Sequence, residues 1–247
     1  MRLDQRLVLL NLAVSRAEAA RLIAEGAVRV DGQPARKASQ TVGDGARLDV
    51  ERAGPGWVGR GALKLLHALD QFGLVPSGAA LDLGASTGGF TEVLLARGAE
   101  SVIALDVGHG QLHPRLAADP RVMVIEGVNA RAIPDGLLPP VDWITADLSF
   151  ISLRKALRPA LAAARPGAQL VVLVKPQFEL GPEVVGKGGI VRDPAAHAAA
   201  RRAVADWLGA SGWKITGETE SPLTGGDGNR ESLLSATGPA GTAPEAS

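Results

Sequence analysis

Hydrophobic positions follow two different patterns along this chain of 247 residues. In the longer pattern, short apolar runs that indicate buried strands alternate with Ala- and Leu-rich stretches typical of helices. These runs occupy residues 79–83, 101–105, 122–125, 143–145 and 169–174. Strands that alternate with helices are the signature of a parallel sheet with crossover helices. The pattern therefore predicts one α/β domain over residues 59–237.

The first fifty residues are patterned differently. Apolar positions recur at helical spacing over residues 3–12 and again from Ser15 to about Glu25. Two short alternating segments, 28–30 and 47–50, then predict strands. We therefore expect a small separate unit over residues 1–52.

Glycine and proline mark the remaining boundaries. The stretch Gly54-Pro55-Gly56 predicts a linker over residues 53–58. The last ten residues, 238–247, are rich in Gly, Pro, Ala and Ser, and we expect them to be disordered.

Composition narrows the classes of function. The 26 basic residues balance the 26 acidic ones, so any attraction for nucleic acid must be local. Residues 1–37 do carry a local excess, with seven Arg or Lys against four Asp or Glu. The sequence contains no cysteine, which excludes disulfides and thiolate metal sites, and we expect no metal.

No apolar run approaches the ~18 residues of a membrane span, and the first residues lack the pattern of a signal peptide. We therefore expect a cytoplasmic protein without a membrane partner.

The basic N-terminal unit carries a recognisable motif. Residues 15–32 read Ser-Arg-x-x-Ala-x-x-Leu-Ile-x-x-Gly-x-Val-x-Val-x-Gly and closely resemble the S4 RNA-binding domain, an α-L fold. In that family two helices present basic side chains to structured RNA. The resemblance implies RNA contacts at Arg2, Arg6, Arg16, Arg21 and Lys37. The alternative is an ordinary solvated basic face.

A glycine-rich turn follows the first strand of the longer domain. It runs from Asp82 through Gly84, Ser86 and Gly88 to Phe90 and opens a helix, which leaves free amide donors for a ligand. Its spacing is not G-x-G-x-x-G, so a dinucleotide fits poorly.

Polar side chains follow three further strands. The carboxylate of Asp106 can accept hydrogen bonds from both hydroxyls of a ribose. Asn129 follows the third strand, where its amide can form hydrogen bonds with the edge of an adenine ring. Asp147 follows the next strand. Any one of these could be a helix cap, but in register they predict a cofactor that contains adenosine.

Two lysines and a glutamate occupy neighbouring segments. The chain has only six lysines against twenty arginines, and Lys175 ends the most apolar strand, just before Pro176. Lys64 begins the helix that leads into the domain, and Glu231 lies in a Gly-rich loop before the last apolar run. Taken singly, Lys64 and Glu231 would each be assigned to a solvated surface.

Nearly the whole chain resembles a known family. Residues 58–236 resemble the FtsJ-like 2′-O-ribose methyltransferases, and with the S4 unit they resemble the TlyA family of ribosomal RNA methyltransferases, also called hemolysin A. The segments that carry the likeness are 60–65, 81–91, 105–112, 146–153, 173–179, 186–193 and 226–231. The resemblance implies a Rossmann-like class I domain that uses S-adenosylmethionine.

The same resemblance assigns individual residues. The family's catalytic tetrad falls on Lys64, Asp147, Lys175 and Glu231. Its S-adenosylmethionine contacts fall on the glycine-rich turn and the strand ends, at Gly84, Ser86, Gly88, Phe90, Asp106, Asn129 and Asp147. It further implies a monomer, without a required protein partner, that methylates a cytidine 2′-hydroxyl in small-subunit (16S) or large-subunit (23S) ribosomal RNA, or in both.

A ribose 2′-hydroxyl is a poor nucleophile, so catalysis should rest on in-line alignment and removal of one proton. Lys175 is the expected base. The cation of Lys64 disfavours the protonated form of Lys175, whereas Asp147 and Glu231 favour it. Residues 186–192, which are glycine-rich, form a hypothetical mobile loop over the RNA.

Three other functions stay open on the sequence alone. An NAD-dependent dehydrogenase would share the sheet and Asp106 but would not require the two lysines. An RNA-binding protein with an inactive methyltransferase fold is compatible with both units. A pore-forming hemolysin is disfavoured, since no segment has the amphipathic or apolar character that a bilayer requires.

Overall fold

The structure is a computed structural model that describes residues 1–240 except 11, 14, 15, 25, 44, 51–55, 226 and 227. It divides into two compact units, Met1–Arg60 and Gly61–Ser247. Residues 53–55, half of the predicted linker, and residues 241–247, most of the predicted tail, lie outside the described residues. Their assignments therefore stay predictions.

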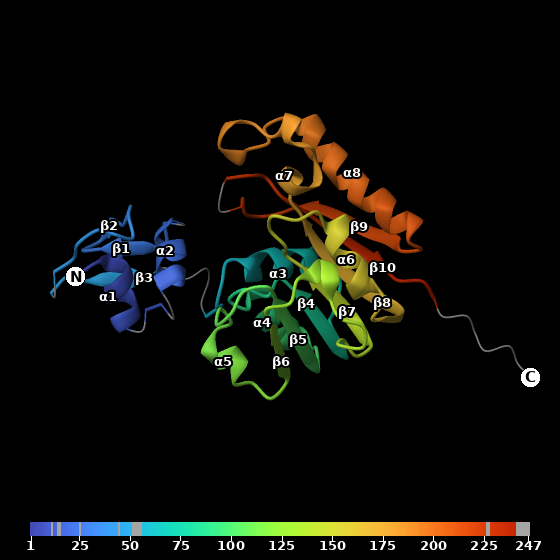
Figure 1. Cartoon of the computed structure of the whole chain (residues 1–247), viewed down its shortest axis with the longest axis horizontal. Helices are drawn as coiled ribbons and strands as arrows, with labels where there is room; N and C mark the ends of the chain where they lie inside the picture. Colours follow the sequence, from blue (N-terminus) through green and yellow to red (C-terminus); the bar gives the residue numbers. More distant parts are fainter. Residues whose placement is uncertain are drawn as a thin grey trace, which may run out of the picture. The chain divides into compact units, whose positions relative to one another are not determined.

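In the first unit, the described residues form two short helices and a small antiparallel sheet (Figure 1). The helices are α1 (Leu3–Leu9) and α2 (Arg16–Ala24), and the sheet order is β2 (Gln33–Pro34), β1 (Val28–Val30), β3 (Leu48–Val50). Asp31 and Gly32 join β1 to β2 with φ angles of 49° and 78°, as a tight hairpin turn requires. Leu3, Leu7 and Val28 are fully buried at its centre. The amphipathic spacing in the sequence thus becomes a small core of its own.

The second unit contains a seven-stranded sheet. Its strands are β4 (Ala79–Leu83), β5 (Ser101–Asp106), β6 (Val122–Glu126), β7 (Val141–Ala146), β8 (Ala164–Val174), β9 (Lys214–Glu220) and β10 (Ser232–Thr237). Its α-helices are α3 (Gly61–Phe72), α4 (Gly89–Arg97), α5 (Pro114–Ala117), α6 (Leu153–Leu161), α7 (Pro176–Glu179) and α8 (Pro194–Ala210). The described residues of this unit also form the 3₁₀ turns η1 (Ala130–Ala132), η2 (Pro182–Val184) and η3 (Lys187–Gly189).

The sheet order is β6-β5-β4-β7-β8-β10-β9. The five strands predicted from the sequence pair in parallel, but β10 is antiparallel to both β8 and β9. The parallel sheet predicted for these five strands is therefore confirmed, and β10 and β9 add an antiparallel edge that the sequence pattern did not predict. The sequence of β9, KITGETE, has one face occupied only by Ile, Gly and Thr, so its apolar alternation is weak.

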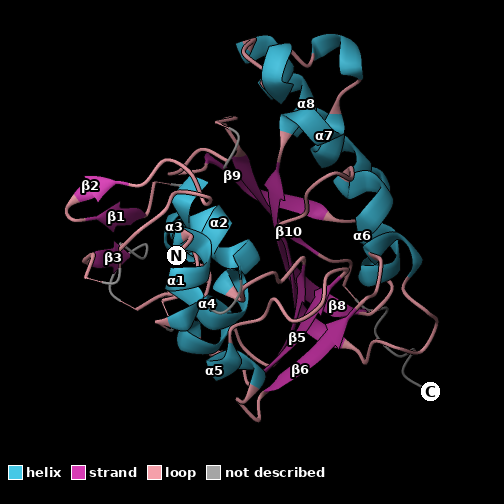
Figure 2. Cartoon of the chain, turned by 60° about the vertical axis from the view of Figure 1, so that its left-hand side comes forward, coloured by secondary structure: helices cyan, strands magenta, loops and turns pink. Residues whose placement is uncertain are grey.

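Helices cover both faces of the sheet. Figure 2 shows α3 and α4 on one face, and α6 and α8 on the other. The face under α6 and α8 has an extensive aliphatic core, in which Leu157, Leu170, Val204 and Leu208 are completely buried. Burial of both faces explains why the parallel strands are almost continuously apolar.

The register of β10 brings a distant segment to the functional edge of the sheet. Ser232, the first residue of β10, pairs with Val174, the last residue of β8. Glu231 and Lys175, one residue beyond each of these, therefore stand together. The ends of β4, β5 and β7 meet at the same edge, as parallel strands must.

Gly217 allows α3 to pack closely on β9. A Cβ atom at this position would lie 2.4 Å from the Phe72 ring and 2.7 Å from Ser235 Oγ. We expect Gly217→Ala to lower the free energy of unfolding by about 1–3 kcal/mol, because the helix must shift. Urea denaturation of both proteins measures the change.

Gly209→Ala is the matched control. Gly209 lies inside α8, and a Cβ atom there would meet nothing within 4 Å. Alanine should stabilise this helical position by about 0.5–1 kcal/mol. Equal effects of the two substitutions would contradict the proposed close packing at Gly217.

Candidate active site

Four charged side chains form two ion pairs at the edge of the sheet. Lys64 on α3 pairs with Glu231, and Lys175 Nζ lies 2.6 Å from Asp147 Oδ1. The side chains are 9% and 2% exposed in the first pair and 11% and 22% exposed in the second. All four residues predicted as a tetrad thus come together, from segments as far apart as residues 64 and 231.

The electrostatics of the two carboxylates differ. Burial acts to raise the pKa of Asp147, but the positive charges of Lys175 and Lys64 outweigh it and hold that pKa below its ordinary value. For Glu231 burial prevails, and its pKa is raised even though Lys64 opposes the shift. Asp147 is therefore the firmly ionised partner of Lys175.

A cavity of about 550 Å³ borders Asp147. Five residues predicted to bind the cofactor line it, namely Gly84, Ser86, Asp106, Asn129 and Asp147. The absence of a side chain at Gly84 is required, because a Cβ atom there would lie 2.5 Å from the Asp147 backbone oxygen. The size and the polar strand ends suit a nucleoside-containing ligand.

Asp106 and Asn129 also bind the local backbone. Asp106 accepts the Ser86 N–H on one carboxylate oxygen (2.8 Å) and the Gly108 N–H on the other (2.7 Å). Asn129 caps η1 by accepting the Arg131 N–H at 3.0 Å, so the possibility of a helix cap is realised here. Each oxygen of Asp106 keeps a second acceptor position, and the Asn129 amide keeps its donors.

Gly88 and Phe90 do not line the cavity. A Cβ atom at Gly88 would meet Leu116 at 2.3 Å, so this glycine allows α4 to pack against the α5 segment. Phe90 is 3% exposed and packs inside the unit. Within the described residues, both act on the shape of the glycine-rich turn rather than on the cavity wall.

The cavity is bordered by strained backbone. Ser86 (φ 48°) and Phe150 (φ 65°) are two of the three described residues other than glycine with positive φ, and both line it. Phe150 is 92% exposed, an unusual state for a large apolar side chain. Strain of this kind persists only where the surroundings enforce it, and it marks functional positions. Sequence reasoning missed Phe150; its only sequence signal is an aromatic residue in the loop after Asp147.

The loop that carries Phe150 is held from α7. Glu179, 5% exposed, accepts the Leu153 N–H at 2.6 Å and the Ser152 hydroxyl at 2.7 Å, at the first turn of α6. The Phe150 ring contacts the Phe178 ring, with centroids 5.4 Å apart. Ser149 on the same loop accepts a hydrogen bond from Lys175 Nζ at 3.0 Å. The loops after β7 and β8 therefore support each other.

Asp82 is a buried carboxylic acid just beneath the glycine-rich turn. It is completely buried, and it accepts hydrogen bonds from Thr91 on α4 (2.7 Å) and Thr145 on β7 (3.0 Å). Burial raises the pKa of Asp82 to about 7, although the two threonines oppose this.

In the first unit, the predicted RNA-binding residues have different exposures. Arg2, Arg16 and Lys37 are exposed, whereas Arg6 and Arg21 are half-buried. Arg2 and Arg16 both bind Asp4, with shortest contacts of 3.0 and 3.1 Å. Chiefly through the hydrogen bonds from Arg2, this arrangement holds the pKa of Asp4 far below its usual range, despite burial. Asp4, to which the sequence analysis assigned no role, holds the two arginines side by side.

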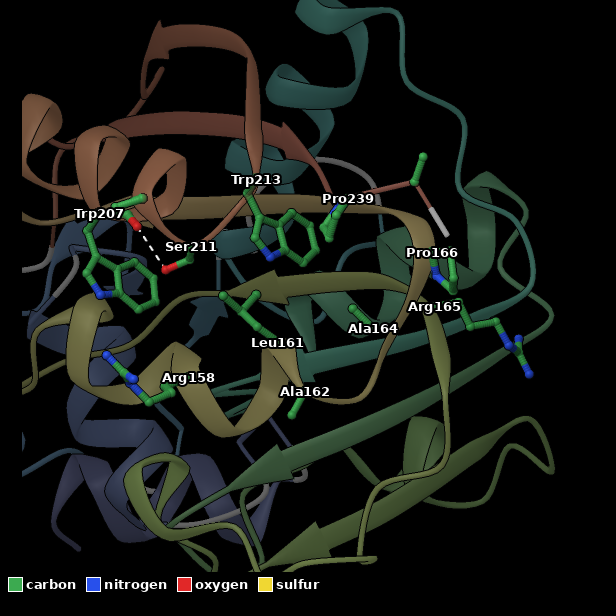
Figure 3. Close-up of a pocket in the computed structure, with 12 residues that line it drawn as sticks. Arg158, Leu161, Ala162, Ala164, Arg165, Pro166, Trp207, Ser211, Trp213 and Pro239 are labelled. Atoms are coloured by element: carbon green, nitrogen blue, oxygen red, sulfur yellow. Dashed lines mark hydrogen bonds between the residues drawn. The ribbon is translucent and has the colours of Figure 1, made fainter. Parts of the chain in front are cut away.

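A larger cavity, of about 720 Å³, lies away from this chemistry (Figure 3). It is formed by the start of β8 with Trp207, Trp213 and Arg158 around it. Lys175 follows the other end of the 11-residue β8, which corresponds to roughly 30 Å. This cavity is therefore not part of the site.

Two further findings concern the described part of the chain. No cluster of His, Cys, Asp or Glu there has the geometry of a metal site. None of its helices combines the length and apolar character needed to cross a membrane.

Known proteins resemble this chain over nearly its whole length. Residues 57–237 match the FtsJ-like methyltransferase family and residues 1–48 match the S4 domain. The chain is 49% identical over 239 residues to the 16S/23S rRNA (cytidine-2′-O)-methyltransferase TlyA of Mycobacterium tuberculosis. The aligned region covers 94% of this chain and 88% of the relative.

Solved structures agree in fold. A candidate hemolysin from Streptococcus thermophilus superposes with a TM-score of 0.76 at 35% identity, over 99% of this chain and 92% of the other. A candidate S-adenosylmethionine-dependent methyltransferase from Listeria monocytogenes, 15% identical, shares the fold with a TM-score of 0.54, over 72% of this chain and 98% of the other. The matches confirm the S4 and methyltransferase resemblances and leave a dehydrogenase without support. The exact domain boundaries stay predictions.

Asp82 should make stability depend on pH. Since its native pKa lies above the ordinary value near 3.8, the native state retains a proton that the unfolded state loses, and stability falls as pH rises from about 4 to 7. Asp82→Asn removes this loss. The free energy of unfolding of the variant minus that of the wild type should therefore increase by about 2–4 kcal/mol from pH 5 to pH 8. Denaturant titrations at the two pH values measure it. A difference that does not change with pH would show that Asp82 is ionised in the native state.

Proposed function

Because the chain belongs to the FtsJ-like methyltransferase family, we propose that it methylates the 2′-hydroxyl of a cytidine in ribosomal RNA, with S-adenosylmethionine as methyl donor. The observation that carries the proposal is the gathering of Lys64, Asp147, Lys175 and Glu231 beside the 550 Å³ cavity. The S4 unit and the relative that is named a cytidine-2′-O-methyltransferase support the RNA substrate.

The cavity fits S-adenosylmethionine chemically. In the cavity wall, Asp106 offers a carboxylate that can accept the hydroxyls of a ribose, and Asn129 offers amide donors for an adenine ring. Gly84 has no side chain to fill the cavity beside them. When bound, S-adenosylmethionine supplies an electrophilic methyl group. Asp147 borders both the cavity and Lys175, so a group transferred from the cavity would emerge at the ion pairs.

Lys175 is the group we assign to proton removal. In its neutral form, Nζ accepts the proton of the 2′-hydroxyl, and the ammonium ion that results is stabilised by Asp147 Oδ1 at 2.6 Å. Ser149 Oγ, 3.0 Å from Nζ, fixes the direction of the side chain. Asp147 stays ionised throughout, because the two lysines keep its pKa low.

Lys64 and Glu231 orient rather than react. They bind each other, and both are nearly inaccessible to solvent. The Glu231 carboxylate, whose pKa is raised by burial, is a suitable acceptor for a ribose hydroxyl, while Lys64 prevents Glu231 from being an isolated buried charge.

Recognition of the RNA is divided between the two units. The S4 unit would bind phosphates of folded rRNA through Arg2, Arg6, Arg16, Arg21 and Lys37. Phe150 offers an exposed ring at the 550 Å³ cavity and directly follows Ser149, which binds Lys175, and unpaired bases stack on such rings. We assign the stacked base to the target cytidine. We further propose that the chain acts in the cytoplasm as a monomer, on the small subunit, the large subunit or both.

The first test is tritium transfer from labelled S-adenosylmethionine to purified ribosomal subunits that lack the modification. Lys175→Ala should reduce transfer by roughly 10²–10⁴-fold, because the hydroxyl loses its base. Affinity for S-adenosylmethionine, measured by calorimetry, should change little, since Lys175 does not line the cavity. Digestion to nucleosides should locate the label at a cytidine 2′-oxygen.

Lys155→Ala is the control, since this lysine is exposed on α6, outside the cluster. It should transfer at the wild-type rate. If the wild type binds S-adenosylmethionine but labels neither subunit, the chain modifies another RNA or is an inactive binding protein.

Phe150 should favour binding of the substrate and lower the stability of the protein. Phe150→Gly should raise the free energy of unfolding by about 1 kcal/mol, because glycine adopts φ 65° without strain and little buried surface is lost. The same change should raise KM for the subunit by about tenfold, the value of one stacked base. Phe150→Tyr should keep KM near the wild-type value. A wild-type KM in the glycine variant would rule out base stacking at this position.

A further inference from the structure

A third cavity, of about 440 Å³, borders the catalytic cluster from the side of β9 and α8. Glu231 belongs both to the wall of this cavity and to the catalytic cluster. The rest of the lining contains three arginines, Arg192, Arg201 and Arg230, together with His197. One further acidic residue, Glu220 at the end of β9, completes the charged lining.

A fully buried asparagine joins the two loops that carry Arg192 and Arg230. Asn229 Oδ1 accepts the Val191 N–H at 2.8 Å, and its Nδ2 donates to the Gly189 carbonyl at 2.8 Å. His197 Nε2 lies 2.9 Å from the Val191 carbonyl oxygen. Arg192 and Arg230 directly follow Val191 and Asn229, so the two guanidinium groups extend from loops that are bonded to each other.

These bonds also bear on the hypothetical mobile loop. Residues 186–192 are tied to the loop that carries Glu231 through Asn229, and to α8 through His197. The backbone at Val191, whose side chain is 2% exposed, is therefore held in place and forms part of the cavity wall. The mobility of the loop stays a hypothesis for the residues before Gly189.

The charges leave a net excess of one cation. Arg201 is paired with Glu218, and Glu231 is paired with Lys64. Arg192 and Arg230 are exposed and have no hydrogen-bonding or ionic partner among the described residues. Together with Glu220 they give a net charge of one positive unit at the cavity wall.

We propose that this cavity binds a backbone phosphodiester of the substrate RNA, next to the ribose that is methylated. The inference rests on the proposed function. A phosphodiester carries one negative charge, which matches the excess, and the planar forks of two arginines match its oxygens. Binding there would fix the backbone adjacent to Glu231 and so align the 2′-hydroxyl with Lys175, while phosphate contacts carry no sequence information.

The test compares arginine variants in the methyl-transfer assay with the subunit that the wild type labels. Arg192→Ala and Arg230→Ala should each raise KM for that subunit by about tenfold, with kcat and S-adenosylmethionine affinity within about twofold of the wild type. The slope of log affinity against log salt should become shallower by about 0.7–0.9 for each phosphate contact that is lost. Arg192→Lys should recover most of the KM, because it keeps the charge.

Two variants separate this site from general attraction. Arg202→Ala removes an exposed arginine of α8 that does not line the cavity, and should change KM by less than twofold. Glu220→Gln removes the opposing charge, and should lower KM by about threefold. Neither effect requires a change in the catalytic tetrad.

The outcomes distinguish this inference from the proposed function. Unchanged KM and salt slope in Arg192→Ala and Arg230→Ala, with transfer that still depends on Lys175, would overturn the phosphate site and leave the proposed function standing. An equal loss in Arg202→Ala would also overturn it. A wild type that binds subunits without methylating them would overturn the proposed function, and the salt slopes of binding would still decide whether the cavity holds a phosphate.

Discussion

The two ion pairs at the edge of the sheet are the interaction on which the site depends. Lys64 with Glu231 and Lys175 with Asp147 place two cations and two anions where little water reaches them, and their charges sum to zero. Loss of one member would leave a buried charge uncompensated, which costs about 3–5 kcal/mol. The four residues are therefore coupled: no single one can change without altering the state of the others, and Asp147 already depends on both lysines.

The pairing register of the strands brings these four residues together. Lys64, Asp147, Lys175 and Glu231 come from a helix, two parallel strand ends and the start of an antiparallel strand. Only the antiparallel direction of β10 allows Glu231 to reach the edge where the parallel strands end, and the pairing of Ser232 with Val174 sets its height. A shift of β10 by one residue would turn Glu231 to the opposite face of the sheet. The irregular edge of the sheet is thus a requirement of the chemistry.

Much of this could be predicted from the sequence, for identifiable reasons. The strands at 79–83 and 28–30 coincide with the observed ones, because compact apolar runs bounded by glycine or polar residues have few other solutions. The antiparallel pair β9 and β10 was missed, since strand direction depends on long-range pairing that local propensity does not encode. The same limit applies to side chains. Lys175 is evident from its strand. The exposure of Phe150, the two hydrogen bonds of the Asn229 side chain and the burial of Asp82 arise only when segments that are distant in the sequence meet.

Strain and buried polarity are concentrated around the same edge. Ser86 and Phe150 adopt left-handed backbone conformations there, and Asp82 is a carboxylic acid buried so fully that its pKa is raised to about 7. Each of these lowers the stability of the unit, by about 1–3 kcal/mol for a strained residue. The compensation must come from elsewhere, and the aliphatic core under α6 and α8, where Leu157, Leu170, Val204 and Leu208 are fully buried, is one source of it. The second face of the sheet therefore serves catalysis indirectly, because its packing keeps an unfavourable site in one conformation.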